Sequence, residues 1–261
     1  MPAQSFQHIL VESRGPVAVV SLNRPDKRNA VNDALLAEIE AFFDTPPDGA
    51  KVVVIEGMGT HFCAGLDLSE HRMRTAVEVM EHSRWWHRVF DKIENGALPV
   101  VAALHGAVVG GGLELAASCH IRVADETAFY ALPEGQRGIY VGGGASVRLA
   151  RLIGAARIAD MMLAGVSYAA AEGNVLGFSQ HLVPAGGALG KALALAERIA
   201  SNAPLTNYAI LQALPRIQDM SRSDGLFVES LMAALVQTSP DAEARMRAFL
   251  EGRAEKTGGR S

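Results

Sequence analysis

The sequence has little cysteine: Cys63 and Cys119 are the only two among its 261 residues. Two cysteines are too few for the disulfide framework of small secreted proteins, so the composition suits a reducing compartment. Residues 1–8 also lack the basic start and the apolar core of a secretory signal peptide. We therefore expect a cytoplasmic protein.

Runs of basic residues are missing as well, and the formal net charge at pH 7 is −4. A nucleic-acid-binding surface needs clustered lysine and arginine, so we expect no nucleic-acid partner. The longest apolar stretch, residues 97–113, is interrupted by a proline, a histidine and several glycines. This pattern is typical of a strand, a turn and a helix start rather than of a membrane helix, so we expect no membrane partner.

Short runs of apolar and β-branched residues alternate with helical or glycine-rich segments over the first part of the chain. The predicted strands are residues 6–12, 17–22, 51–56, 99–104 and 121–124. The first two flank residues 14–16 (RGP), which predicts a hairpin. Asn32 is placed to cap the helix that follows it. Strands that alternate with helices indicate an α/β fold with parallel pairing.

From about residue 191 the strand signal ends and only helical periodicity remains. The predicted helices are residues 191–201, 204–214, 221–237 and 241–253. We therefore divide the chain into a core at residues 1–190, which carries the candidate binding and catalytic loops, and a helical region at residues 191–261. We interpret the helical region as an oligomerisation element.

Two glycine-rich loops follow predicted strands, at residues 57–68 and 105–115. Small residues at a strand end let the backbone approach a ligand closely, and the second loop leads into a helix start with partly positive N–H groups. Two N–H groups that converge on one point would form an oxyanion hole. For the glycines alone, tight turns and close helix packing are the better explanation. A phosphate cradle is disfavoured, because neither the Walker pattern nor Gly-x-Gly-x-x-Gly occurs.

Three segments resemble, in their order and spacing, the signatures of the enoyl-CoA hydratase (crotonase) family. They are residues 22–30 (LNRPDKRNA), 61–68 (HFCAGLDL) and 110–116 (GGGLELA), and the similarity runs from about residue 6 to residue 253. The resemblance implies a spiral α/β fold of ββα units (crotonase type, ClpP-like) with a helical C-terminal trimerisation region. It also implies an acyl-CoA thioester substrate and assembly as a homotrimer or a dimer of trimers.

The resemblance further implies roles for individual residues. The N–H groups of Leu66 and Gly111 would form the oxyanion hole, and the N–H of Gly142 would face the reacting water. Val141 stands where the family usually has proline, so this loop departs from the family pattern. The residues expected near coenzyme A are Lys27, Arg28, Ala30, Ala64, Asp67 and Leu68. Solvated surface charge explains Lys27 and Arg28 equally well.

Glu114 and Glu134 are the side chains that distinguish between possible reactions. Each lies in an apolar segment, and a buried glutamate is costly unless it is paired or protonated. Both positions match the two glutamates of the hydratase members of the family. We expect Glu134 to donate a proton to Cα and Glu114 to hold and activate the water, as a pair that titrates together. The alternatives are a helix-dipole role for Glu114 and a solvated surface charge at Glu134.

Trp85 and Trp86 fall in a predicted helix at residues 71–94, which in this family lines the acyl pocket. Both could line and shorten that pocket, core packing explains them equally well, and we favour core packing for one of the two. The eight histidines are not spaced as metal ligands. We expect Cys63 to be a small buried residue rather than a nucleophile.

Taken together, the residues and the resemblance predict an enzyme, a hydro-lyase that reversibly hydrates a 2-enoyl-CoA to a 3-hydroxyacyl-CoA without a metal or redox cofactor. Two alternatives within the family are an enoyl-CoA isomerase and a hydratase for an unusual acyl group such as methylthioacryloyl-CoA. A third is a non-catalytic acyl-CoA-binding or RNA-binding module. The two glutamates argue against an inert binder, and the acidic net charge argues against RNA.

Overall fold

The computed structural model describes residues 6–70 and 74–253 and separates into two compact units, Met1–Ala200 and Ser201–Ser261. The sequence placed this division at residues 190 and 191, ten residues too early. The reason is helix α7 (Ala188–Ala200), whose alanines pack on the sheet of the first unit. A helical period alone cannot tell a helix that covers a sheet from one in a separate helical layer.

A six-stranded sheet forms the centre of the first unit, in the order β1-β2-β3-β4-β6-β9. Its strands are β1 (Ile9–Arg14), β2 (Val17–Leu22), β3 (Val52–Gly57), β4 (Val100–Leu104), β6 (Ile121–Asp125) and β9 (His181–Val183). Strands β1 and β2 form the predicted antiparallel hairpin, and the other neighbours are parallel. Strands β2 and β4 are buried along their whole length, which explains their runs of valine and alanine.

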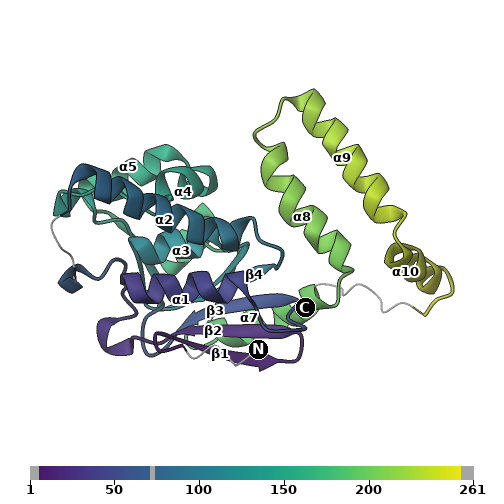
Figure 1. Cartoon of the computed structure of the whole chain (residues 1–261), viewed down its shortest axis with the longest axis horizontal. Helices are drawn as coiled ribbons and strands as arrows, with labels where there is room; N and C mark the ends of the chain where they lie inside the picture. Colours follow the sequence, from purple (N-terminus) through teal and green to yellow (C-terminus); the bar gives the residue numbers. More distant parts are fainter. Residues whose placement is uncertain (1–5, 71–73, 254–261) are drawn as a thin grey trace. The chain divides into compact units, whose positions relative to one another are not determined.

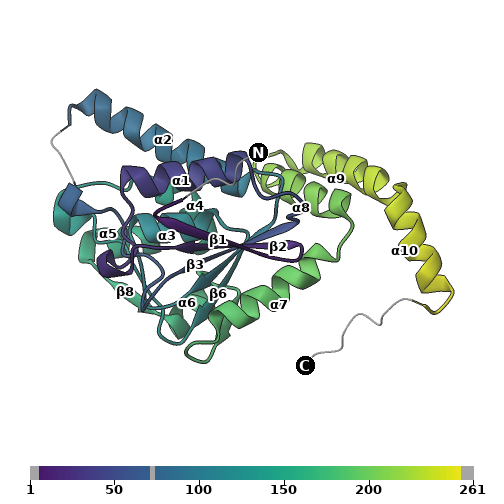
Figure 2. The ribbon, with the colours of Figure 1, turned by 60° about the horizontal axis from the view of Figure 1, so that its bottom comes forward.

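Helices cover both faces of this sheet (Figures 1 and 2). One face packs against α7, and the other packs against the layer that carries the candidate site. The helices of that layer are α1 (Asp33–Asp44), α2 (Ala76–Glu94), α3 (Gly111–Ser118), α4 (Ala145–Ile153) and α5 (Ala155–Ala164). Asn32 caps α1 as predicted, since its side chain accepts a hydrogen bond from the backbone N–H of Leu35.

A second, three-stranded sheet was not predicted from the sequence. It consists of β5 (Ala107–Val109), β7 (Phe129–Ala131) and β8 (Ser167–Ala169), followed by helix α6 (Ala170–Leu176). Strands β5 and β7 are parallel, and the N–H of Gly110 donates to the carbonyl of Ala131 at 2.9 Å. This pairing brings the second glycine-rich loop beside the segment that carries Glu134.

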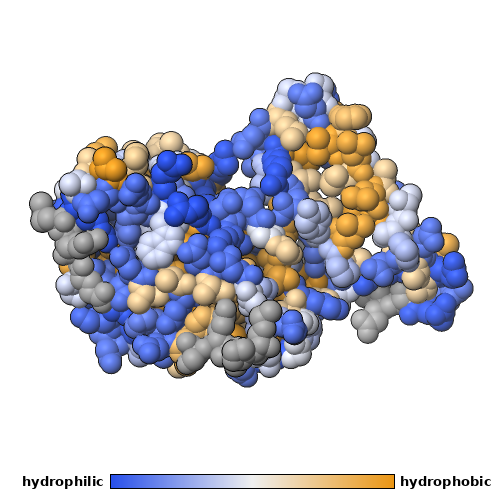
Figure 3. Space-filling model, in the orientation of Figure 1, coloured by the Kyte–Doolittle hydropathy of each residue, from blue (hydrophilic) through white to orange (hydrophobic). Residues whose placement is uncertain are grey.

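The second unit contains α8 (Pro204–Ile217), α9 (Arg222–Gln237) and α10 (Pro240–Leu250), close to the predicted helices. Apolar side chains gather on the surface of α8 and α9 (Figure 3). The exposed ones on the two helices include Tyr208, Ile210, Leu214, Leu226, Phe227, Leu231 and Leu235. No helix in the described part of the chain combines the length and the apolar character that crossing a membrane requires.

Candidate active site

Both predicted glutamates line one pocket of about 140 Å³ between α2, α3 and the loop that precedes α4. This volume exceeds the roughly 30 Å³ that one water occupies in the liquid, so the pocket has room for a reacting group beside a water. The lining residues are Leu66, Arg74, Val79, His82, Ser83, Trp86, Gly111, Glu114, Glu134, Ile139, Tyr140, Val141, Gly142 and Gly143.

The N–H groups of Leu66 and Gly111 lie close together at the pocket wall. A Cβ atom added to Gly111 would lie 3.6 Å from the Leu66 nitrogen and 2.8 Å from the Trp86 ring, so only glycine fits there. Gly111 opens α3, where a helix leaves its first N–H groups without intrahelical acceptors. Within residues 6–70 and 74–253, no acceptor is found for either N–H. The two amides are therefore placed to act as oxyanion donors.

Hydrogen bonds to Val31 hold the residues on either side of Leu66. The carbonyl of Gly65 accepts from the N–H of Val31, and the N–H of Asp67 donates to the carbonyl of Val31. Gly65 has φ +93°, and a Cβ atom there would lie 2.8 Å from the carbonyl oxygen of Val109. Glycine at position 65 therefore allows both the turn and the close approach of the two glycine-rich loops.

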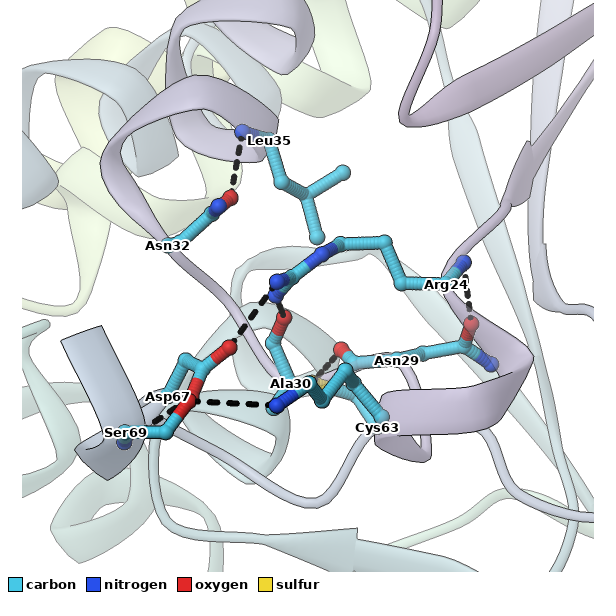
Figure 4. A network of polar contacts seen from close by, with 9 residues as sticks. Arg24, Asn29, Ala30, Asn32, Leu35, Cys63, Asp67 and Ser69 are labelled. Atoms are coloured by element: carbon cyan, nitrogen blue, oxygen red, sulfur yellow. Dashed lines mark hydrogen bonds and ion pairs between the residues drawn. The ribbon is translucent and has the colours of Figure 1, made fainter.

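A buried ion pair behind this loop joins Arg24 to Asp67 at 2.9 Å (Figure 4). Arg24 also donates to the carbonyl of Ala30, and Asp67 accepts from the hydroxyl and the backbone N–H of Ser69. Burial by itself raises the pKa of Asp67, but the hydrogen bonds from Ser69 and Arg24 outweigh it and hold the pKa below its usual value. The Asp67 carboxylate thus braces the loop, and its contact with coenzyme A stays a prediction.

The other residues expected near coenzyme A surround this brace. Lys27 and Arg28 are exposed, and the Lys27 ammonium lies 3.3 Å from the Ser69 hydroxyl. The N–H of Ala64 donates to the carbonyl of Arg28, while Leu68 is exposed at the start of a short 3₁₀ helix (Leu68–Glu70). Their contact with coenzyme A stays a prediction.

Glu114 lies in the first turns of α3 and is only 3% exposed. Its Oε1 accepts hydrogen bonds from the backbone N–H groups of Gly143 and Ala145, at 2.8 and 2.9 Å. Burial raises the pKa of Glu114, while these two donors act in the opposite direction. Glu114 therefore holds the start of α4, rather than only complementing the dipole of its own helix.

Glu134 precedes a short 3₁₀ helix (Gly135–Arg137) and is 7% exposed, so it is not a solvated surface charge. Its Oε2 is buried, and no hydrogen-bond partner for it exists in the described part of the chain. Burial raises the pKa of Glu134 to about 7, and the neighbouring charge of Glu114 adds to the rise. A carboxyl group that is protonated near neutral pH can donate a proton.

The loop before α4 depends on two residues that the sequence did not single out. The Ser83 hydroxyl donates to the carbonyl of Gly142 at 2.7 Å. The Arg148 guanidinium donates to the carbonyl of Gly143 at 2.9 Å and to Glu94 at 2.6 Å. Gly142 itself lines the pocket, and the contact of its N–H with the reacting water stays a prediction. Ser83 comes from a helix that is distant in sequence from this loop, and no local motif marks either residue.

The two tryptophans of α2 face different surroundings. Trp86 is buried, lines the pocket and packs edge-on against Phe90. Trp85 is not part of this lining, and its indole N–H donates to Glu40 of α1 at 2.7 Å. Adjacent residues of a helix point about 100° apart, so only one of them can face the pocket. The expectation that Trp85 lines the acyl pocket is therefore corrected.

Cys63 is fully buried, and its thiol lies 3.0 Å from the carbonyl of Asn29. Burial raises the pKa of Cys63 to about 12, which keeps the thiol protonated and unreactive, as predicted. Over the described ranges, no three histidine, cysteine, aspartate or glutamate side chains are grouped closely enough to bind a metal ion.

Comparison with known proteins identifies the family of the chain. The family model for enoyl-CoA hydratase/isomerase matches residues 12–259. An enoyl-CoA hydratase of Mycobacterium tuberculosis is 34% identical over 96% of both chains, and a 2,3-dehydroadipyl-CoA hydratase of Escherichia coli is 32% identical over 98% of this chain and 100% of its own.

Solved structures point to the same family. A crystal structure from Rhodopseudomonas palustris, provisionally described as an enoyl-CoA hydratase, is 56% identical with a TM-score of 0.93, over 96% of this chain and 98% of that one. The enoyl-CoA hydratase of Bacillus anthracis is 31% identical with a TM-score of 0.89, over the same shares of the two chains. These enzymes have the crotonase fold, and the present chain belongs to the enoyl-CoA hydratase/isomerase family.

Proposed function

We propose that this enzyme hydrates 2-enoyl-CoA thioesters to 3-hydroxyacyl-CoA through the pair Glu114 and Glu134 and the oxyanion donors Leu66 and Gly111. The observation that carries the proposal is the meeting of two buried glutamates and two neighbouring backbone N–H groups in one pocket. A base, an acid and an oxyanion hole are the three elements that addition of water to a conjugated thioester needs.

The steps follow from the surroundings of each group. Glu114, whose charged form is stabilised by its two backbone donors, takes a proton from water while the water oxygen forms a bond to Cβ. The electron pair of the C=C bond moves toward the thioester, and the N–H groups of Leu66 and Gly111 bind the oxygen as it gains enolate charge. Glu134, whose pKa is about 7, then gives its proton to Cα. The sum is the addition of H and OH across the double bond, so no metal or redox cofactor is needed for the balance.

The acyl group cannot be carried over from relatives. Proteins of similar identity are named short-chain-enoyl-CoA hydratase, 2,3-dehydroadipyl-CoA hydratase and mevalonyl-coenzyme A hydratase. Enoyl-CoA isomerisation is the second candidate reaction, because the family description includes it. Two glutamates in the pocket favour hydration, since shifting a double bond needs one proton relay and no activated water.

A homotrimer, alone or paired, is our proposal for the assembly. The exposed apolar side chains of α8 and α9 would be covered by another copy of the chain. Light scattering on the purified protein, before and after Phe227→Glu, tests this: a trimer or hexamer that dissociates in the variant is the expected result. A monomeric wild type would contradict it. Cytoplasmic location stays a prediction.

The reaction is tested with crotonyl-CoA. Loss of the conjugated-thioester absorbance, with 3-hydroxybutyryl-CoA as the identified product, is the expected result. Absence of turnover with crotonyl-CoA and every other 2-enoyl-CoA, together with conversion of 3-enoyl-CoA, would replace the hydratase by an isomerase.

A further inference from the structure

The pocket has a polar side that the hydration chemistry does not use. Arg74 and His82 are part of its lining, together with the apolar Val79, Ile139 and Tyr140. A guanidinium in the wall of a pocket made only for a hydrocarbon chain would lose solvation without gaining a partner from the substrate.

Arg74 and His82 are separated from the oxyanion donors along the direction of α2. Trp86 lies against Gly111, since a Cβ atom added at position 111 would lie 2.8 Å from the Trp86 ring. His82 and Val79 lie four and seven residues nearer the N-terminus of the same helix, about 6 and 10 Å along its axis. Arg74 precedes the helix. The polar side chains are thus displaced from the oxyanion donors toward and beyond the N-terminus of α2.

One carboxylate, outside the pocket lining, contacts both Arg74 and His82. Asp33 at the start of α1 lies 3.2 Å from the Arg74 guanidinium and 2.7 Å from Nε2 of His82. Asp33 is 57% exposed and is not part of the lining, whereas the Arg74 side chain is only 11% exposed. A ligand in the pocket therefore meets the donors and not the carboxylate that holds them.

The guanidinium of Arg74 can donate to a further acceptor. Arginine carries five N–H donors in a planar fork. Across the described residues, the hydrogen bond found for Arg74 is the single one to Asp33. A second carboxylate, supplied by a substrate, would match the fork in size and charge. The exposed side chains of Ile139 and Tyr140 leave this end of the pocket near solvent, which limits the cost of bringing a charge there.

We propose that Arg74, beside His82, binds a carboxylate at the distal end of the acyl chain, so that the preferred substrates are mono-CoA thioesters of unsaturated dicarboxylic acids. Arg74 is then a specificity-determining residue, and Asp33 is the residue that positions it. This inference rests on the proposed hydratase function and names the substrate class of the same pocket.

The test compares matched pairs of 2-enoyl-CoA thioesters with six, seven and eight acyl carbons, one ending in a methyl group and one in a carboxylate. The methyl ester of each acid is the uncharged control. We expect the wild type to favour the carboxylate over both partners by at least about tenfold in kcat/KM at one or more lengths. A preference for the methyl-ended chain at every length would overturn the inference. Crotonyl-CoA hydration is measured in parallel: turnover without a carboxylate preference refutes this inference alone, and absence of all hydration refutes the proposed function.

Variants assign the preference to residues. Arg74→Met should lower the carboxylate-to-methyl ratio by about tenfold or more, and Arg74→Lys should lower it less. Arg84→Met is the matched control: it removes an exposed arginine of α2 that is not part of the lining, and should leave the ratio unchanged. An equal loss on both substrates in Arg74→Met would assign Arg74 to the coenzyme A moiety and overturn the proposal. If Arg74→Met does not fold, the Arg74→Lys and wild-type ratios still decide.

Discussion

The two carboxyl groups of the pocket differ in the hydrogen bonds that they accept. Glu114, at the start of α3, is bonded by two backbone N–H groups from the start of α4, which favours the charged form. Glu134, beside the second glycine-rich loop, has a buried oxygen without a partner in the described residues, which favours the neutral form. Burial raises the pKa of both carboxyl groups, and at Glu114 the backbone donors offset part of that rise. This difference in donors favours Glu114 as the base and Glu134 as the acid.

The largest expected effect comes from removing both carboxyl groups in a double-mutant cycle. We expect Glu134→Gln and Glu114→Gln each to lower kcat for crotonyl-CoA hydration by about a hundredfold or more, with little change in binding. The double variant should be little worse than the poorer single variant, because residues that act on one reaction are strongly non-additive. Additive losses would refute a coupled pair. Near-normal turnover in Glu114→Gln would leave a single-carboxylate enzyme and favour isomerisation.

Replacement of Gly111 by proline tests the oxyanion hole. Proline removes the N–H at the first position of α3, which a helix tolerates, but its ring meets Trp86. Gly111→Ala keeps the N–H and meets the same ring, so it is the steric control. We expect the proline variant to have a kcat about a hundredfold below that of the alanine variant. Equal activities of two folded variants would remove Gly111 from the oxyanion hole.

The protonation of Glu134 predicts how stability depends on pH. Its pKa in the folded protein is raised from 4.5 to about 7, so the folded state holds this proton more tightly than the unfolded chain. The contribution is fully present below the unfolded pKa and is lost as pH rises through about 7, by about 2 kcal/mol after allowance for screening.

Glu134→Gln lacks this titration and should therefore be more stable than the wild type at pH 8, with the difference vanishing below about pH 4. Melting temperatures at a fixed protein concentration measure it. A difference in Tm that stays constant across this pH range would mean that Glu134 is ionised at neutral pH, which would remove its role as the acid.

The smallest effect is expected at Ser83, which holds the loop on the Glu114 side. Ser83→Ala loses the hydrogen bond to the carbonyl of Gly142 and should cost about 1 kcal/mol of stability with a few-fold lower kcat. Ser230→Ala, in α9, is a control with a hydroxyl bonded inside its own helix. The same small change in both variants would show that the loop before α4 does not depend on Ser83.

Much of the fold could be predicted, because the strands and helices carry local signals. The hairpin of β1 and β2, the cap at Asn32 and the buried strand β3 follow from turn residues, a capping side chain and a run of valines. The small sheet was missed, because its three-residue strands are too short to show a period. The placement of α7 was wrong because its alanine stripe fits a sheet as well as another helix.

What the sequence by itself determined was the family and the identity of the two glutamates and the two glycine-rich loops. What only the tertiary structure decided was which groups surround them: the backbone donors on Glu114, the burial of the Glu134 carboxyl, the Arg24–Asp67 brace and the Arg74–Asp33–His82 cluster. Motifs record the residues that react, because each of them lies in a short segment of characteristic sequence. Burial, charge pairing and proton affinity depend on residues brought together from distant segments, and only the folded chain specifies those neighbours.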